Sequence, residues 1–232
     1  MSRSLRTVWQ HNKVVIGLTV IAVVLLCAWP TYATRLDVKA QTPKTFYVDT
    51  SAGRNQIAIS SESTLEDFTI VCNAVSGQWQ LDPQNIEQIS GQFSIQVEDL
   101  HTGIALRDHH LRSADWLDAA KYPLITIAVK GAENGRLNSA NTASMTLIGS
   151  CTLHGTTRDV RIPCTLTYLD ETPQTMQRVK GDLIRLRAEF SIELSDYGVK
   201  GPQGSDIIGL KVANTLPIKV SIFGSTTNRQ HR

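Results

Sequence analysis

Aromatic residues, cysteine and methionine are scarce in this chain of 232 residues, and neither sign of charge predominates. Phenylalanine, tryptophan and tyrosine make up 6% of the sequence, and 23 lysines and arginines stand against 21 aspartates and glutamates, a formal net charge of +2. A nucleic-acid-binding protein needs a strongly basic stripe, so we predict no nucleic-acid partner. The chain also has no repeat, low-complexity tract or run of like charges, and its length suits one sizeable domain.

The spacings typical of metal and hydrolase sites are missing as well. The sequence has no HExxH, no paired CxxC and no GxSxG. His109 and His110 are neighbours, and on a helix such neighbours point about 100° apart and do not readily share one ion. We therefore predict no metal, no cofactor and no catalytic residue. Hydrolysis of a lipid ester with His109 or His110 as the base is kept as an alternative.

The one long hydrophobic run lies near the N-terminus. Basic residues precede the stretch "VVIGLTVIAVVLLCAW", and "TYA" follows it up to Ala33. These features are typical of a secretory signal, so we predict that the chain is exported to the periplasm or secreted, with cleavage after Ala33 or with the segment retained as a membrane anchor. The expected organisation is a leader over 1–33, a linker over 34–43, a domain over 44–224 and a flexible tail over 225–232.

Alternation of apolar and polar residues with a period of two recurs through the rest of the chain. It is clear in "QFSIQVE", "LITIAVK", "RLRAEFSIEL" and "LPIKVSIFG", and such alternation predicts half-buried β-strands. About eight to ten antiparallel strands with one polar face imply an all-β sandwich or closed barrel, and a barrel of eight strands can enclose a ligand. The predicted inward residues of the best strands are Phe93, Ile95, Val97, Ile125, Ile127, Val129, Leu147, Ile162, Leu166, Ala188, Phe190 and Ile192.

A hairpin is predicted between Met145 and Tyr168. Its arms are "MTLIGSCTL" and "VRIPCTLTY", joined by the turn "HGTTRD", and they place Cys151 and Cys164 on the same inner face. Cysteines opposite one another across two strands can come within disulfide range. A disulfide between Cys151 and Cys164, or two small buried hydrophobes, are both consistent with this pattern. Cys72 is then an odd third cysteine in the exported part.

The stretch "LRDHHLRSADWLDAAKYP" is the densest polar patch in the chain. We expect "RSADWLDAAKYP" to form a helical turn or two, with Ser113 as its N-terminal cap and Trp116 on its apolar side. Pro123 should end this segment before the strand "LITIAVK" begins. The predicted role of the patch is structural: a short helix that caps one end of the barrel.

The same stretch resembles the signature of the YceI-like family, which runs through Asp-x-His-Leu-Arg-Ser-Ala-Asp to Tyr-Pro. Two further segments, "GSCTLHGTTRDVRIPCTL" and "FSIELSDYGV", are similar to later motifs of that family, in the same order. The residues that carry the resemblance are Arg107, Asp108, His110, Leu111, Arg112, Ser113, Asp115, Trp116, Tyr122, Pro123, His154, Gly155, Asp196, Tyr197 and Gly198. The chain departs from the family pattern in lacking an early-strand histidine and in carrying Cys151 and Cys164.

The resemblance implies an extended, lipocalin-like antiparallel barrel of about eight strands with a long internal tunnel. It also implies a bound polyisoprenoid or isoprenoid quinone, with no catalysis established for the family as a whole. The inward residues above then become wall candidates, and Trp116 and Tyr122 would close one mouth. A compact module that docks to a membrane or redox partner without a ligand is the second hypothesis. Membrane association through the leader and a dimeric state stay open.

Overall fold

A computed structural model describes residues 33–202 and 207–228 of the chain. The predicted leader over 1–33 lies, except for its last residue, outside the described residues, and so do residues 229–232 of the predicted tail. None of the helices in the described part has the length and apolar character needed to cross a membrane.

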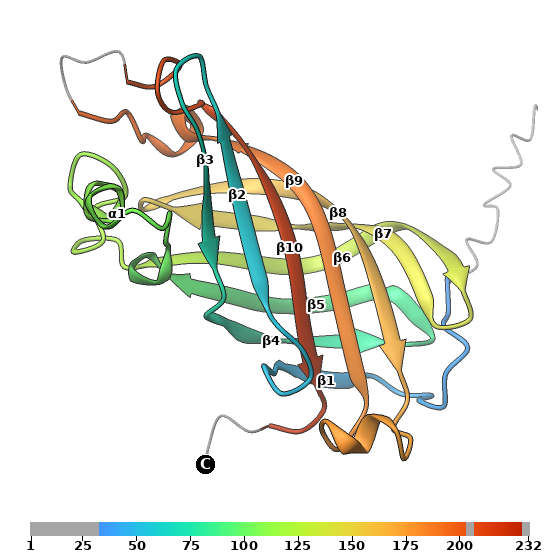
Figure 1. The fold of residues 1–232 in the computed structure, drawn as a ribbon. Helices are drawn as coiled ribbons and strands as arrows, with labels where there is room; N and C mark the ends of the chain where they lie inside the picture. Colours follow the sequence, from blue (N-terminus) through green and yellow to red (C-terminus); the bar gives the residue numbers. More distant parts are fainter. Residues whose placement is uncertain (1–32, 203–206, 229–232) are drawn as a thin grey trace, which may run out of the picture. The chain divides into compact units, whose positions relative to one another are not determined.

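Ten strands and one short α-helix make up most of the described chain (Figure 1). The elements are β1 (Lys44–Val48), β2 (Gln56–Glu62), β3 (Asp67–Cys72), β4 (Val75–Asp82), β5 (Asn85–Gln96), α1 (Ala105–Arg112), β6 (Leu124–Ser139), β7 (Thr142–Leu153), β8 (Thr156–Leu169), β9 (Leu183–Glu193) and β10 (Thr215–Ser225), with 3-10 turns at Val97–Asp99, Thr175–Gln177 and Leu194–Tyr197. The segments "KTFYVDT", "NQIAIS", "EDFTIVCN" and "GQWQLD", whose alternation is weaker than that of the other strands, correspond to β1 to β4.

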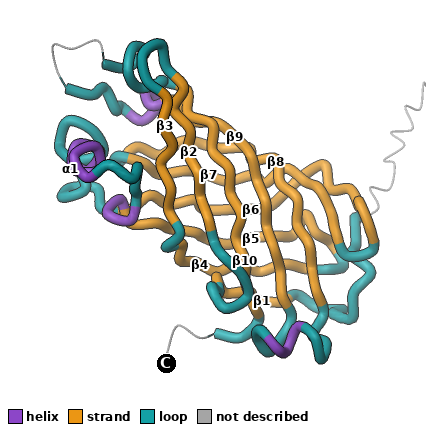
Figure 2. The backbone as a smooth tube through the Cα atoms, in the orientation of Figure 1, coloured by secondary structure: helices purple, strands orange, loops and turns teal. Residues whose placement is uncertain are grey.

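Eight strands close into an antiparallel barrel in the order β1-β4-β5-β6-β7-β8-β9-β10, because β10 pairs back to β1. This closing seam is short: Tyr47 pairs with Ser225 and Val48 with Gly224. The first half of β10 pairs instead with β2, and the β2–β3 hairpin extends the wall at the end where α1 lies (Figure 2). The predicted all-β, lipocalin-like fold with a short helix is therefore confirmed.

The strands keep the predicted alternation, with apolar side chains inside the barrel. In β7 every second residue from Ala143 to Leu153 is buried. At the end of the barrel away from α1, the interior is filled by an aromatic group of Phe46, Trp79 and Tyr168, each no more than 1% exposed. The Phe46 and Trp79 rings lie 6.0 Å apart and the Phe46 and Tyr168 rings 5.6 Å apart, measured between centroids.

The hairpin of β7 and β8 has a shorter turn than predicted. Only His154 and Gly155 form it, both with positive φ (50° and 70°), and Leu153 pairs directly with Thr156. This register sets Cys151 opposite Arg158 and Cys164 opposite Met145, six residues away along the ladder. That separation is ~20 Å at about 3.3 Å per residue, far beyond disulfide reach. Both thiols are free and buried, so of the two alternatives the possible disulfide is contradicted and the two small buried hydrophobes are what the structure contains.

The helix also lies earlier than predicted. α1 ends where the expected segment begins, and Ser113 is its C-terminal cap rather than its N-terminal cap. The Ser113 hydroxyl donates to the carbonyl oxygen of His110 at 2.7 Å. The following residues form turns, in which the amide of Asp118 donates to the carbonyl of Ser113, and Asp118 itself has a φ of 46° that a helix does not tolerate. Pro123 directly precedes β6, as expected.

Candidate functional site

A pocket of about 410 Å³ opens at the α1 end of the barrel. It lies among α1, the β2–β3 hairpin, the segment after β9, and the ends of β7, β9 and β10. We call it the mouth pocket. Its apolar lining is Ile59, Phe68, Ile70, Leu100, Leu111, Trp116, Leu117, Leu153, Ile192, Leu194, Val199, Pro202, Ile207, Val212 and Leu216; its polar lining is Ser61, Glu66, Thr102, Arg107, His110, Ser113, Asp115 and Lys211. Its size and its mostly apolar wall are typical of small-molecule sites.

Inner-face residues below the mouth pocket keep part of their surface exposed. Phe93, Ile125, Ile127 and Phe190 point into the barrel and are packed on the core, yet they are only half-buried. In a solid core such residues would be buried like their neighbours, so the interior is open on this side. We call this part of the barrel the open half, and the aromatic-filled part the packed half.

The structure therefore divides the predicted wall residues into two groups. Trp116 and Ile192 line the mouth pocket, and four more lie in the open half. The remaining barrel residues, Ile95, Val97, Val129, Leu147, Ile162, Leu166 and Ala188, are all 8% exposed or less and belong to the packed core. The apolar interior therefore opens at the α1 end, and the aromatic group of Phe46, Trp79 and Tyr168 fills the opposite end.

Several wall residues of the mouth pocket were missed in the sequence. Ile59 and Ile70 come from β2 and β3, whose alternation in "NQIAIS" and "EDFTIVCN" is weaker than that of the later strands. Val199 and Val212 lie in the turn-rich segment after β9, where no periodic pattern marks an inward residue.

Arg107 fastens α1 to the β2–β3 hairpin across the mouth. Its guanidinium forms an ion pair with the carboxylate of Glu66 and lies over the Phe68 ring, with Cζ 4.5 Å from the ring centroid. Glu66 and Phe68 both line the mouth pocket. The predicted structural role of Arg107 thus takes a specific form, a clasp between the helix and the hairpin.

Asp108 anchors the start of α1 to the segment before it. Its Oδ1 accepts hydrogen bonds from the amide and from the hydroxyl of Thr102, both at 2.6 Å, and Oδ2 lies 3.5 Å from Nδ1 of His101. These bonds, the Thr102 hydroxyl first, lower the pKa of the Asp108 carboxyl below its usual value. Arg112 acts similarly at the end of α1, where Nη2 donates to the carbonyl of Leu100 at 3.1 Å.

The three sequence motifs meet at this end of the barrel. The Tyr122 and His154 rings lie edge to face with centroids 4.8 Å apart, and a Cβ on Gly155 would come within 2.4 Å of the Tyr122 ring. Nδ1 of His154 lies 3.3 Å from the carbonyl oxygen of Tyr197. Arg158 donates from Nε to the carbonyl of Asp196 at 2.9 Å, and Gly198, with φ of 71°, ends the 3-10 turn. Tyr122 therefore packs on the hairpin turn and does not line the mouth pocket.

The polar side chains that line the mouth pocket are either exposed or already hydrogen-bonded or ion-paired. His110 and Asp115 line the pocket and are exposed, and His109 is exposed on the helix. No cluster of three or more histidine, cysteine or acidic side chains suited to a metal occurs in the described part of the chain. The Ser113 hydroxyl is already engaged with a backbone carbonyl.

Large apolar side chains are exposed around the mouth pocket. Leu65 and Leu106 are 62% and 66% exposed, and Ile104 and Leu210 follow at 50% and 41%. Leu65, Leu106 and Leu210 each lie next to a lining residue in the sequence. The amide of Leu65 donates to the carbonyl of Leu210 at 3.0 Å. The mouth therefore offers an apolar rim to an entering ligand.

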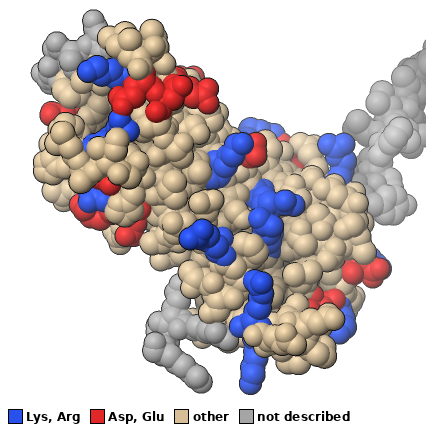
Figure 3. Space-filling model, viewed as in Figure 1, with Lys and Arg blue, Asp and Glu red and all other residues tan. Residues whose placement is uncertain are grey.

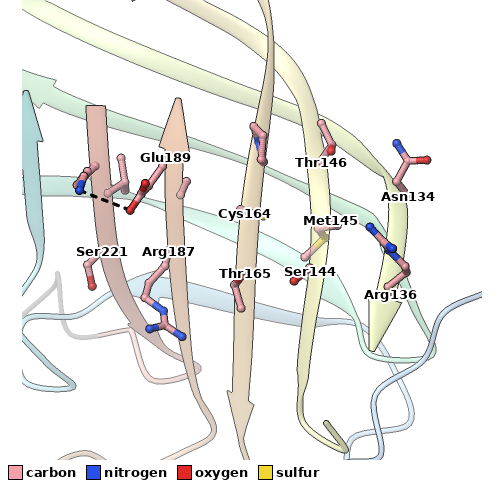
Figure 4. Close-up of a pocket in the computed structure, with 14 residues that line it drawn as sticks. Asn134, Arg136, Ser144, Met145, Thr146, Cys164, Thr165, Arg187, Glu189 and Ser221 are labelled. Carbon is pink, nitrogen blue, oxygen red and sulfur yellow. Dashed lines mark ion pairs between the residues drawn. The ribbon is translucent and has the colours of Figure 1, made fainter. Parts of the chain in front are cut away.

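A second, larger depression of about 630 Å³ lies over the outer face of β6 to β10 (Figure 4). Arg136, Ser144, Thr165, Arg187 and Ser221 follow one another in register across these strands. Lysine and arginine side chains are spread along the middle of the visible face, whereas acidic ones gather toward the β2–β3 end (Figure 3). This depression is open and carries charged side chains such as Arg136, Arg187 and Glu189, so it lacks the enclosed apolar wall that a hydrocarbon ligand needs.

Comparison with known proteins places these features in a family context. A family model described as the YceI-like domain matches residues 46–223. A UPF0312 protein of Vibrio cholerae is 28% identical over 143 residues, covering 60% of this chain and 69% of the relative. A UPF0312 protein of Pseudomonas savastanoi pv. phaseolicola is 30% identical over 151 residues, covering 64% and 68%.

Two solved structures share the fold. Burkholderia cenocepacia BcnA superposes with a TM-score of 0.57 at 20% identity, covering 76% of this chain and 98% of that one. A domain from Saccharophagus degradans, described as a polyisoprenoid-binding domain implicated in plant cell wall breakdown, gives 0.55 at 16% identity, with 78% and 97% covered.

Proposed function

Because the chain belongs to the YceI-like family, we propose that its barrel binds a lipid-type amphiphile, an isoprenoid or isoprenoid quinone, in the mouth pocket and the open half. The observation that carries the proposal is the set of inward apolar side chains that stay half-buried below an apolar mouth. The Saccharophagus degradans domain, described as polyisoprenoid-binding, supports the choice of ligand class.

The physics of the chamber suits a carrier. Transfer of about 400 Å² of hydrocarbon from water at ~25 cal/mol per Å² yields on the order of 10 kcal/mol before the cost of immobilising the chain. A bilayer solvates the same chain nearly as well, so exchange between the protein and a membrane is close to balanced. Such a balance allows the protein to take up and release its ligand without chemistry, and we propose a non-enzymatic role.

We also propose that this exchange takes place outside the cytoplasm. The basic start, apolar run and small-residue exit of the first 33 residues support export to the periplasm or the exterior. If the leader is retained, it would hold the barrel near the membrane that supplies the lipid.

The test is lipid loading of natively expressed protein, with two charge substitutions on β9. Ile192→Asp puts a carboxylate into the mouth pocket, whereas Ser191→Asp puts the same group on the exposed outer face one residue away. Because a buried unpaired carboxylate is costly, we expect Ile192→Asp to reduce co-purified lipid, measured by mass spectrometry, at least tenfold. The control should keep wild-type loading. Absence of lipid from wild-type protein, and no binding of added isoprenoid, would refute the proposal.

A further inference from the structure

We infer that this barrel accepts a short isoprenoid chain and excludes long ones, because an aromatic floor built around Trp79 closes the chamber halfway. The inference rests on the proposed function and adds the length of the ligand. Its evidence is the change in exposure along the inner face, the packing of Trp79, and the volume that remains.

Exposure of the inward residues falls sharply along single strands. On β9, Ile192 and Phe190 are half-buried, and the next inward residue, Ala188, is 5% exposed. On β6, Ile127 is half-buried and Val129 is 6% exposed. Exposure of the inward side chains therefore falls along β6 and β9, whereas on β5, β7 and β10 the inward residues toward α1, such as Ile95, Leu153 and Leu216, are buried as well.

Trp79 is fitted into the interior at that boundary. Its ring centroid lies 5.1 Å from that of Phe93, the half-buried residue above it, and 6.0 Å from that of Phe46 below. Gly224 makes room for the indole, because a Cβ there would lie 2.4 Å from Cη2. Gly91 allows the close approach of the Trp79 backbone, because a Cβ there would lie 2.5 Å from Cβ of Trp79. The wall is thus shaped to hold a large ring inside the barrel.

The floor is supported from the packed half. The Tyr168 ring meets Phe46 edge to face, and the Tyr168 hydroxyl donates to Oδ2 of Asp182 at 2.7 Å. Phe46 and Tyr168 are both completely buried. A chain that reached past Trp79 would have to displace these rings, which interdigitate as closely as a protein core.

The volume above the floor limits the length of the ligand. A methylene group takes roughly the space of one water molecule, about 30 Å³, so a mouth pocket of 410 Å³ holds on the order of 14 such groups. That is about three isoprene units of five carbons each, before any space in the open half is counted. A chain of nine units would leave most of its hydrocarbon in water or in the membrane.

The experiment compares alcohols of increasing length on the complete, delipidated protein. Farnesol, geranylgeraniol and solanesol, with three, four and nine isoprene units, compete with a fluorescent fatty acid in the presence of cyclodextrin. We expect farnesol and geranylgeraniol to displace the probe and solanesol to bind at least tenfold more weakly. Equal affinity for solanesol would overturn the length limit while leaving the proposed function intact. Failure of all three alcohols, and of the probe, would instead refute the proposed function.

Substitutions at Trp79 and Phe93 test whether the aromatic floor causes the limit on ligand length. The indole nitrogen of Trp79 makes no hydrogen bond within the described residues, so Trp79→Leu removes volume without removing a hydrogen bond. Phe93→Ala widens the chamber just above the floor and leaves the side chains of Trp79, Phe46 and Tyr168 unchanged. In both variants we expect the ratio of the farnesol affinity to the solanesol affinity to fall at least threefold. Trp116→Ala, at the mouth, should instead weaken the binding of all three alcohols by the same factor. An unchanged ratio in both folded floor variants would overturn the assignment.

Discussion

Substitution of Gly224 by alanine is the sharpest test of how the barrel is packed. In β10, a Cβ at this position would meet Cη2 of Trp79 at 2.4 Å, Cζ2 at 3.0 Å and the carbonyl oxygen of Tyr47 at 2.9 Å. The tryptophan is 1% exposed, so its ring is surrounded by other side chains. Overpacking of this kind costs about 1–3 kcal/mol, and we expect Gly224→Ala to lie near the upper end of that range.

The cost should depend on Trp79 itself. Trp79→Leu leaves a cavity and destabilises the protein by about 2–4 kcal/mol, but it also removes the atoms that a Cβ at position 224 would meet. In that background we expect Gly224→Ala to cost no more than about 1 kcal/mol, a coupling energy of about 1–2 kcal/mol. The contact with the Tyr47 carbonyl remains, so the rescue is incomplete.

The assay is urea unfolding of the four proteins of this double-mutant cycle, followed by circular dichroism. Gly131→Ala serves as the matched glycine control, because a Cβ there would have its nearest contact at 3.5 Å, an ordinary van der Waals distance. It should change the free energy of unfolding by less than about 0.5 kcal/mol. Additive costs for Gly224→Ala and Trp79→Leu would show that the indole is not what Gly224 accommodates, and the argument for the aromatic floor would lose its main support.

Two further predictions concern titrating side chains. Since the pKa of Asp108 is lowered in the folded state, its charged form stabilises the protein above the ordinary carboxyl pKa, and this contribution is lost as the pH falls through the folded-state value. Asp108→Asn should therefore be less stable than wild type at pH 7, with the gap in urea midpoint closing at acid pH; a gap independent of pH would contradict this. Cys151 and Cys164 should both react with a thiol reagent in unfolded, unreduced protein. They should react only slowly in folded protein, where burial raises the pKa of Cys164 to about 12. A linked pair of tryptic peptides, lighter by two hydrogens than the two peptides together, would instead reveal a disulfide.

The sequence predicted the elements whose pattern is local. Alternation in "RLRAEFSIEL" gives β9 and its inward face, because neighbouring residues alone decide which side of a strand is apolar. The motif residues around α1 and the β7–β8 turn gave the family and the end of the barrel at which they meet.

The predictions that were wrong concern features that depend on contacts between residues far apart in the sequence. The turn at His154 and Gly155 was predicted too long because a histidine with positive φ is uncommon. α1 was placed too late because its start is fixed by Thr102 and Asp108 rather than by Ser113. A filled and a hollow barrel show the same alternation, and the floor joins Phe46, Trp79 and Tyr168 from three strands, so the half-open interior was not visible in the sequence.

The short seam between β1 and β10 and the pairing of β10 with the β2–β3 hairpin affect how the barrel can open locally. Two residue pairs join these strands, and beyond them β10 passes to the β2–β3 hairpin, which is fastened to α1 by the clasp of Arg107 and Glu66. The hairpin pairs with β10 alone among the barrel strands, so it can loosen as a unit while the rings at the opposite end stay packed, since local opening begins where few buried contacts resist it. Loading and unloading would then need only a flap to lift, and the barrel need never come apart.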